Sequence, residues 1–276
     1  MQTMSHTAVP IGLFDSGVGG LSVLRAVRQL LPAQPVIYFA DQCHVPYGSR
    51  PLQEVRAFAQ EITRFLLTQG ARQIVVACNT ASAAALHELR EGFPQVSFVG
   101  MEPAVKPAAE QTRTRVVGVL ATPATFQGAL YASVVERFAQ DVTLLQSTCP
   151  GLVQEIEAGR LDGAVTCQIL QEALLPMLGE HIDTVVLGCT HYPFVIPLIQ
   201  RLVGPDVRVI DPAPAIARQI RRQLEANTWL AAGEQPAPVC YITSGFAESF
   251  NNQLLHLLGE NGAAQTIRWD ADDHLP

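Results

Sequence analysis

Two segments of this 276-residue chain share one pattern, and this internal repeat limits the possible fold more than any other feature. The stretches IVVACNT at 74–80 and TVVLGCTH at 184–191 each run from β-branched apolar residues into a cysteine followed by polar residues. In an open α/β sheet, ligands bind beyond the carboxyl ends of the strands. Cys78 and Cys189 are therefore both predicted to face a bound substrate.

A second pair of positions extends the repeat. One apolar strand near the start delivers Ser16, and a later one delivers Thr122. The two hydroxyl residues are separated by 122 − 16 = 106 positions and the two cysteines by 189 − 78 = 111. Two independent offsets that agree within a few residues predict two homologous lobes.

Strand and helix signals alternate along the chain, as in parallel sheets covered by helices. Strands are predicted at 11–14, 36–39, 74–77, 97–99, 116–120, 142–145, 184–187, 207–210 and 239–243. Proline-containing joints flank the second repeat. We expect an α/β fold of two pseudo-symmetric lobes, each a mainly parallel sheet flanked by helices, with the active site between them. Residues 1–99 and 212–276 are predicted to form the first, discontinuous lobe, and residues 100–211 the second.

The composition is that of an ordinary globular protein, with 48% hydrophobic and 16% charged residues. A chain of this length can bury a large core. Its net charge of −7 argues against a broad surface for nucleic acid or for a membrane. The basic group Arg218, Arg221 and Arg222 is predicted to be one solvated face of a helix.

The segment Met1–Val9 is short and mixed, without the pattern of an export signal, and the apolar runs are too short to span a bilayer. We therefore expect a cytoplasmic protein with no membrane partner and no nucleic-acid partner. The six cysteines show no CxxC clustering. In a reducing compartment they are expected to be free thiols.

A cysteine placed directly before a helix meets the positive end of the helix dipole. Backbone amides there favour the thiolate and lower the thiol pKa from its usual value of about 8.5. Cys78 and Cys189 are therefore predicted to act as bases. The remaining cysteines are expected to pack as small apolar groups; they are Cys43, Cys149, Cys167 and Cys240.

The loop DSGVGG at 15–20 follows the first predicted strand and opens a helix. It lacks the spacing of a dinucleotide or phosphate-binding loop, so nucleotide binding is poorly supported. Its glycines would let backbone amides approach a small anion such as a carboxylate. Ser16 would add a hydroxyl donor, and Asp15 would bind a substrate ammonium or orient an acid–base group. A turn in which Asp15 caps the helix explains the segment almost equally well.

Neutral polar or turn-forming residues occur at or near strand ends and in the loop after Asp41: Pro46, Tyr47, Gly48, Asn79, Thr80, Thr122, Thr125 and Thr190. A site for substrate carboxylates and an ammonium requires such groups, although each one singly is consistent with a helix cap or a turn. His191 stands two residues after Cys189, on the same side of an extended segment. It is a candidate proton partner for that thiol, or a group that polarises a substrate carboxylate.

The sequence predicts no metal and no organic cofactor. A metal site would need Cys78, Cys189 and His191 to converge with a fourth ligand, and no ligand-like spacing supports this. Lys106 is the only lysine and lies between Val105 and Pro107, away from any predicted strand end. Since a pyridoxal phosphate enzyme forms its Schiff base on a lysine, that cofactor has almost no available anchor. Proton chemistry in this chain is therefore expected to be cofactor-free.

Five segments together resemble the glutamate racemases, within the wider aspartate/glutamate racemase superfamily: 15–20, 46–48, 77–82, 102–108 and 188–193. The similarity runs from about residue 11 to the end of a helix predicted at 246–259. It implies a cofactor-independent isomerase that interconverts L- and D-glutamate, supplies the D-isomer for peptidoglycan and forms a homodimer. The substrate would lie between two α/β lobes related by a pseudo-twofold axis.

The resemblance also implies roles for individual residues. One cysteine of the Cys78–Cys189 pair would remove the α-proton as a thiolate, while the other donates a proton to the opposite face. Substrate contacts are implied for Asp15, Ser16, Tyr47, Gly48, Asn79, Thr80, Thr190 and His191. Assisting catalytic roles are implied for Asp15, for His191 and for a glutamate after Cys149, where we favour Glu157 over Glu155.

Two other functions stay open from the sequence. A racemase, isomerase or decarboxylase of another small dicarboxylate, such as aspartate, would use the same fold and thiols. A two-lobed protein that binds an amino acid without turning it over would share the lobed plan. Paired thiols have no purpose in simple binding, which favours an enzyme.

Overall fold

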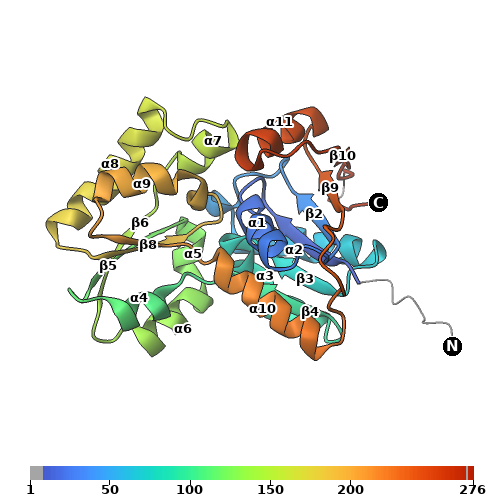
Figure 1. The fold of residues 1–276 in the computed structure, drawn as a ribbon, viewed down its shortest axis with the longest axis horizontal. Helices are drawn as coiled ribbons and strands as arrows, with labels where there is room; N and C mark the ends of the chain where they lie inside the picture. The colour runs from blue at the N-terminus through green and yellow to red at the C-terminus, as the bar shows by residue number, and fades with distance from the viewer. Residues whose placement is uncertain (1–8, 272) are drawn as a thin grey trace.

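The computed structural model describes residues 9–271 and 273–276. Two separate parallel sheets lie side by side and form the two halves of the molecule (Figure 1). Residues 1–8 fall outside the described range, and with them the start of the predicted first lobe and most of the segment judged to lack an export signal. The α/β fold with two mainly parallel sheets flanked by helices is confirmed.

The larger sheet has six strands in the order β10-β9-β2-β1-β3-β4. Their bounds are β1 Ile11–Asp15, β2 Val36–Ala40, β3 Gln73–Val76, β4 Ser97–Gly100, β9 Val239–Thr243 and β10 Gln265–Thr266. The smaller sheet has four strands in the order β6-β5-β7-β8. Their bounds are β5 Val116–Ala121, β6 Thr143–Ser147, β7 Thr184–Gly188 and β8 Arg208–Ile210. Only the two-residue β10 lacks a counterpart among the predicted strands.

The strands of the two sheets come from different parts of the chain. The first four strands and the two C-terminal ones form the larger sheet, and β5 to β8 form the smaller. The division into one lobe of residues 1–99 and 212–276 and a second of residues 100–211 stays a prediction.

The internal repeat is visible in the strand register. The order β2-β1-β3-β4 in one sheet corresponds to β6-β5-β7-β8 in the other. Gly12 pairs with Ile74 between β1 and β3, and Gly118 pairs with Val185 between β5 and β7. These pairs are again separated by 118 − 12 = 106 and 185 − 74 = 111 positions. The offsets measured at the hydroxyl and cysteine residues therefore hold inside the sheets, as a duplication predicts.

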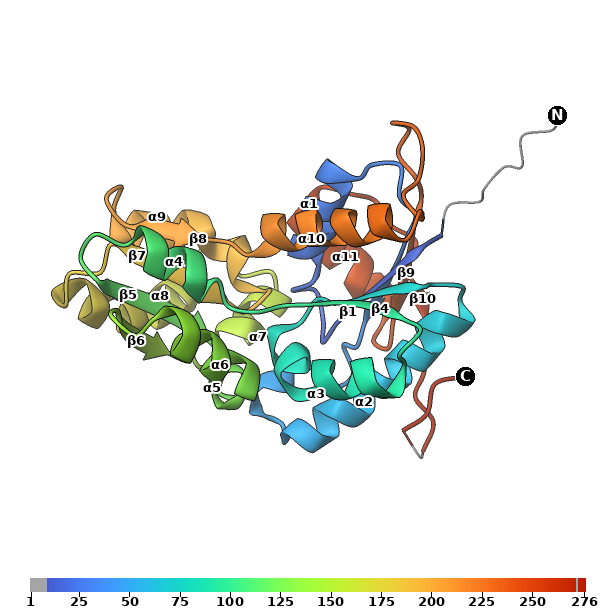
Figure 2. The same cartoon turned by 90° about the horizontal axis from the view of Figure 1, so that it is seen from below.

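Helices cover both faces of the larger sheet (Figure 2). α1 (Leu21–Leu30), α10 (Ala213–Ala226) and α11 (Ala247–Leu258) lie on one face, and α2 (Leu52–Thr68) and α3 (Asn79–Gly92) on the other. The sequence explains these helices, because apolar side chains recur at helical spacing and point inward. In α2 the apolar side chains at this spacing are buried: Val55, Phe58, Ala59, Ile62, Phe65 and Leu66. The three arginines of α10 are exposed, as predicted.

The smaller sheet is covered in the same way. α4 (Val105–Gln111) and α6 (Ala129–Phe138) pack on one face, and α8 (Ala164–Gly179) and α9 (Ile196–Val203) on the other. The short helices α5 (Pro123–Gln127) and α7 (Leu152–Glu157) and the 3-10 turns η1 (Tyr47–Ser49) and η2 (Tyr192–Val195) lie where the two halves meet. Within the described residues, no helix has both the length and the apolar character needed to cross a bilayer.

Candidate active site

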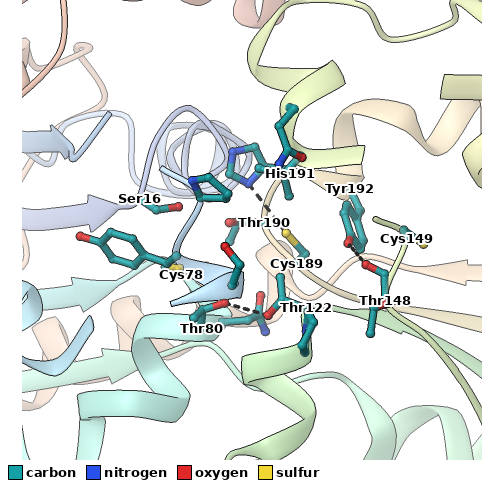
Figure 3. Close-up of a pocket in the computed structure, with 18 of the residues that line it drawn as sticks. Ser16, Cys78, Thr80, Thr122, Thr148, Cys149, Cys189, Thr190, His191 and Tyr192 are labelled. Carbon is teal, nitrogen blue, oxygen red and sulfur yellow. Dashed lines mark hydrogen bonds between the residues drawn. The ribbon is translucent and has the colours of Figure 1, made fainter. Parts of the chain in front are cut away.

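A cavity of about 230 Å³ lies between the two halves, at the carboxyl ends of the strands of both sheets (Figure 3). Equivalent strands supply its wall. The larger sheet contributes Ser16 after β1, Tyr47 after β2 and Cys78 after β3. The smaller sheet contributes Thr122 after β5, Cys149 after β6 and Cys189 after β7. The duplication therefore brings both predicted thiols to one cavity.

The structure places the predicted site residues in two layers. Most of them line the cavity: Ser16, Pro46, Tyr47, Gly48, Cys78, Asn79, Thr80, Thr122, Cys189, Thr190 and His191. Asp15, Thr125 and Glu157 stand behind this lining, and each bonds to a residue in it. The predicted set is thus brought together, but these three carboxyl and hydroxyl groups act on the cavity through other side chains.

Cys78 is the N-cap of α3, and its sulfur accepts a bond from the amide of Ala81 at 3.5 Å. The predicted position at a helix start is therefore correct. The predicted lowering of its pKa is wrong, because burial raises the pKa of the Cys78 thiol well above its usual range and the charge of Asp15 adds to this. The amides of Ala81 and Ser16 act in the opposite direction but do not compensate. Desolvation outweighs the helix dipole here and favours the neutral thiol of Cys78 over its thiolate.

Cys189 has a different environment. Its sulfur lies 3.7 Å from Nδ1 of His191, whose Nε2 donates to Oε1 of Glu157 at 2.7 Å. Burial alone would lower the pKa of His191, but its bonds to Cys189 and Glu157 outweigh that effect and raise this pKa well above the usual value. Burial opposes ionisation of Glu157, yet its pKa is lowered by His191 and by the amide of Val18. An imidazolium–carboxylate pair therefore stands behind the Cys189 thiol.

The two candidate glutamates point to different partners. Glu157 contacts His191, whereas Glu155 forms a bidentate ion pair with Arg160. In that pair, Nε and Nη2 of Arg160 each donate to one carboxylate oxygen of Glu155 at 2.7 Å. The geometry therefore favours Glu157, the residue preferred from the sequence, as the partner of the site histidine.

The glycines of the loop after β1 make room for the other half of the molecule. A Cβ on Gly17 would overlap the carboxylate of Glu157, and a Cβ on Gly19 would overlap the ring of His191. The amide of Val18 donates to Glu157 at 2.8 Å. The loop was predicted to let its amides approach a small anion, and the anion at Val18 is the protein's own carboxylate.

Comparisons with known proteins agree with this geometry. The model of the Asp/Glu/hydantoin racemase family matches residues 12–220. The chain belongs to this family. The glutamate racemase of Pseudomonas paraeruginosa is 50% identical over 256 residues, which cover 93% of this chain and 96% of that protein.

Solved structures of glutamate racemases share the fold of this member of the Asp/Glu/hydantoin racemase family. A crystal structure of an isoform from Bacillus anthracis has a TM-score of 0.85 and 32% identity, and covers 95% of this chain and 98% of that one. The structure from Francisella tularensis, in complex with D-glutamate, has a TM-score of 0.82 and 28% identity, with coverage of 95% and 98%. The fold of the whole described chain is therefore that of the glutamate racemases.

In this family member, hydroxyl groups bridge the two halves at the cavity. Thr80 of α3 and Thr122 after β5 share a hydrogen bond of 2.8 Å, and Thr122 and Thr125 share one of 2.9 Å. Asn79 lies beside them, and neither its amide nitrogen nor its carbonyl oxygen has a partner although both atoms are buried. Buried polar groups are normally hydrogen-bonded, so this amide marks a place where a polar ligand belongs.

A network behind Tyr47 was not predicted from the sequence. The Tyr47 hydroxyl donates to Asp41 at 2.5 Å, and Ser244 and Trp269 also donate to that carboxylate, each at 2.8 Å. His44 lies 2.9 Å from Asp41, and its bonds to Asp41 and Cys43 outweigh partial burial and raise its pKa to about 10. These bonds hold Tyr47 against the cavity.

The only group of three potential metal ligands found among the described residues is Asp41, Cys43 and His44, whose ligand atoms lie within 4.8 Å of one another. The carboxylate of Asp41 is already engaged by several donors, so the donor set is better suited to supporting Tyr47 than to holding an ion. Cys43 and Cys240 are exposed, and their predicted packing as buried apolar groups is wrong. Cys43 lies in the loop beyond β2, and Cys240 is the second residue of β9, before its buried part begins.

The segment after β6 also lines the cavity but was not predicted. It contributes Thr148, Cys149, Pro150, Gly151, Val153 and Gln154. Cys149 is buried, as expected, and burial raises its pKa to about 12. The repeat contained the signal for this segment, because β6 is the counterpart of β2 and the loop after β2 was predicted to contribute Pro46, Tyr47 and Gly48.

Proposed function

We propose that this protein is a cofactor-independent glutamate racemase that uses two cysteines. The observation that carries the proposal is the position of Cys78 and Cys189, which come from equivalent strand ends of two homologous halves and face one cavity. Inversion of a carbon centre by proton transfer needs access to both of its faces. Two thiols presented from opposite halves provide that access without moving the substrate.

The proton balance of the reaction follows from this arrangement. One sulfur, as a thiolate, takes the α-proton of the amino acid, and the electron pair of the broken C–H bond passes to the α-carbon and its carboxylate. The other sulfur, as a thiol, donates its proton to the opposite face. The substrate is neither oxidised nor reduced, and the two sulfurs exchange protonation states. Their roles are reversed for the other enantiomer.

Substrate binding is assigned to the polar lining. The unpartnered amide of Asn79 and the hydroxyls of Ser16, Thr80, Thr122 and Thr190 suit the carboxylates and the ammonium of a small amino acid. Neutral donors stabilise the charge that develops on the α-carboxylate without trapping the substrate as an ion pair. Pro46, Tyr47 and Gly48 would close the cavity on the other side, and Thr125 would orient Thr122.

Assisting roles are assigned to three buried ionisable groups. His191, held by Glu157, would control the proton on Cys189. Asp15 is fully buried, where desolvation raises its pKa, and it accepts a bond from the hydroxyl of Thr190 at 3.0 Å. We assign it the orientation of Thr190 and an electrostatic influence on Cys78.

The substrate assignment to glutamate rests on the relatives. The 50% identical protein from Pseudomonas paraeruginosa is a glutamate racemase, and the Francisella tularensis structure holds D-glutamate. By the same family membership, the product would supply peptidoglycan synthesis. Assembly as a homodimer and location in the cytoplasm stay predictions.

The test compares Cys78→Ser, Cys189→Ser and the exposed-site control Cys240→Ser in deuterated water. We expect both site variants to lose racemisation of L- and D-glutamate, while Cys240→Ser keeps the wild-type rate. For the wild type, early product should carry deuterium while recovered substrate stays largely unlabelled, because different groups handle the two protons. Near-normal racemisation by either site variant, or faster turnover of aspartate than of glutamate, would contradict the proposal.

A further inference from the structure

The carboxylate of Glu157 accepts hydrogen bonds from residues of the other half of the molecule. Glu157 ends α7, beside the smaller sheet, and its Oε1 accepts from the amide of Val18 at 2.8 Å. Its Oε2 accepts from Nε2 of Gln42 at 3.2 Å. Nε2 of Gln253 lies 3.5 Å from the same Oε2 and also donates to the Glu157 carbonyl. Val18, Gln42 and Gln253 all belong to the half with the larger sheet.

The two glutamines also fix each other. Nε2 of Gln42 lies 2.7 Å from Oε1 of Gln253, and Oε1 of Gln42 accepts from the Thr243 hydroxyl at 2.9 Å. Thr243 ends β9, so the orientation of the Gln42 amide is set by the sheet itself. Both side chains are neutral donors, which leaves the carboxylate charge of Glu157 available to His191.

The two oxygens of the Glu157 carboxylate therefore have different partners. Oε1 faces His191 at 2.7 Å together with the Val18 amide, while Oε2 faces the glutamines. A buried carboxylate must have its oxygens satisfied, and a terminal carboxyl torsion turns readily when one oxygen has no donor. Loss of the donors at Oε2 would let the group rotate and weaken its contact with His191.

We propose that Gln42 and Gln253 are positioning residues for proton transfer at Cys189, which they influence by holding Glu157 against His191. This inference rests on the proposed racemase function and extends it. Because the glutamines and Glu157 come from opposite halves, the alignment of Glu157 with His191 depends on the contact between the two halves. The titratable groups that face His191 are Cys189, Glu157 and Asp15.

The experiment uses the full chain with Gln42→Leu, Gln253→Leu and the control Gln168→Leu. Gln168 lies exposed on α8 and also donates to a glutamate, Glu172, at 2.9 Å, but it is not among the residues that line the cavity. We expect kcat to fall about tenfold in the first two variants, the size of loss that follows a small misplacement of a reacting group. The alkaline limb of the pH profile should move to lower pH, since a loosely held Glu157 supports the His191 charge less well. The control should match the wild type in both measurements.

A double-mutant cycle separates positioning from general damage. In the background of Glu157→Gln, addition of Gln253→Leu should cause no further shift of the alkaline limb, because the group that it positions is already neutral. Variants that lose kcat with an unmoved limb, or that keep wild-type kcat, would overturn the inference. If the wild type itself fails to racemise glutamate, the proposed function is wrong. If the wild type racemises glutamate and the Gln42→Leu and Gln253→Leu variants behave like the Gln168→Leu control, the proposed function stands and the positioning role is wrong.

Discussion

Cys78 and Cys189 occupy equivalent places in the two halves, yet their surroundings differ. Cys78 caps a long helix, and burial and the nearby Asp15 raise its pKa. Cys189 is followed by a 3-10 turn and has His191 at 3.7 Å, with Glu157 behind it. The duplication preserved the backbone position of each thiol while the neighbouring charges diverged. The proposed mirror-image reactions would thus be served by two chemically unlike acid–base groups.

This difference has a kinetic consequence. Two enantiomers have the same free energy in water, so a racemase must have equal kcat/KM in both directions. Any asymmetry between the two thiols is therefore confined to the separate values of kcat and KM and to isotope effects. The predictions that follow use these quantities to test how unlike the two sides are.

The largest effect is expected for His191→Asn, which removes the proposed proton partner of Cys189 while keeping a polar side chain. Loss of a general acid–base group costs about 10²–10⁴-fold in rate. We expect kcat to fall within that range, and the primary deuterium isotope effect to increase in one direction more than in the other. Measurement with α-deuterated L- and D-glutamate checks this. Equal changes in both directions would show that the two thiols share His191.

Gly19→Ala should come next, because the new methyl group would overlap the His191 ring and lie 2.7 Å from the Thr190 hydroxyl. Overpacking of this kind costs about 1–3 kcal/mol of stability. We expect a lower midpoint of thermal unfolding and a loss of activity of about tenfold or more. The control is Gly92→Ala, since nothing lies within 4 Å of a Cβ at Gly92. Wild-type activity in Gly19→Ala would show that the halves do not meet as closely as described.

A pH shift is expected for Glu157→Gln. Glu157 helps to hold the pKa of His191 above its usual value, so its neutralisation lowers that pKa and the alkaline limb of kcat moves toward neutral pH. Glu155→Gln serves as the matched control, because Glu155 pairs with the exposed Arg160 and not with His191. A profile of kcat against pH for both variants checks the assignment. An identical alkaline limb in Glu157→Gln and in the wild type would show that the ionisation of His191 does not cause this limb.

The smallest effect is expected on the Cys78 side, for Tyr47→Phe. The substitution removes the hydroxyl that donates to buried Asp41 at 2.5 Å, and loss of a bond to a buried charged group costs about 1–3 kcal/mol. We expect a lower unfolding midpoint, a raised KM and a nearly unchanged alkaline limb. Tyr241→Phe removes a comparable but partly exposed bond to Glu260 and should cost less. A shift of the alkaline limb in Tyr47→Phe would link this network to His191.

Most of the cavity lining was predictable, because it depends on strand ends that the local pattern reveals. Thr122 and Cys189 follow buried apolar strands, and parallel strands bring their carboxyl ends to one edge. The Thr148–Gln154 segment was missed although a strand was predicted before it, because only the correspondence of β6 with β2 in the repeat indicates that the segment faces the cavity. Gln42 and Gln253 carry no local signal at all, since their partner Glu157 lies 115 and 96 positions away from them in the sequence.

The sequence by itself determined the strands, the duplication and the presence of a cysteine at two equivalent strand ends, since apolar periodicity and turn residues act over short distances. The tertiary structure decided which glutamate meets His191, what the loop glycines accommodate and why the pKa of Cys78 is raised. Those properties depend on desolvation and on charges from residues such as Asp15, which the fold brings near Cys78. Burial and Coulomb interactions are set by distance in space, and the order of residues along a chain does not contain that distance.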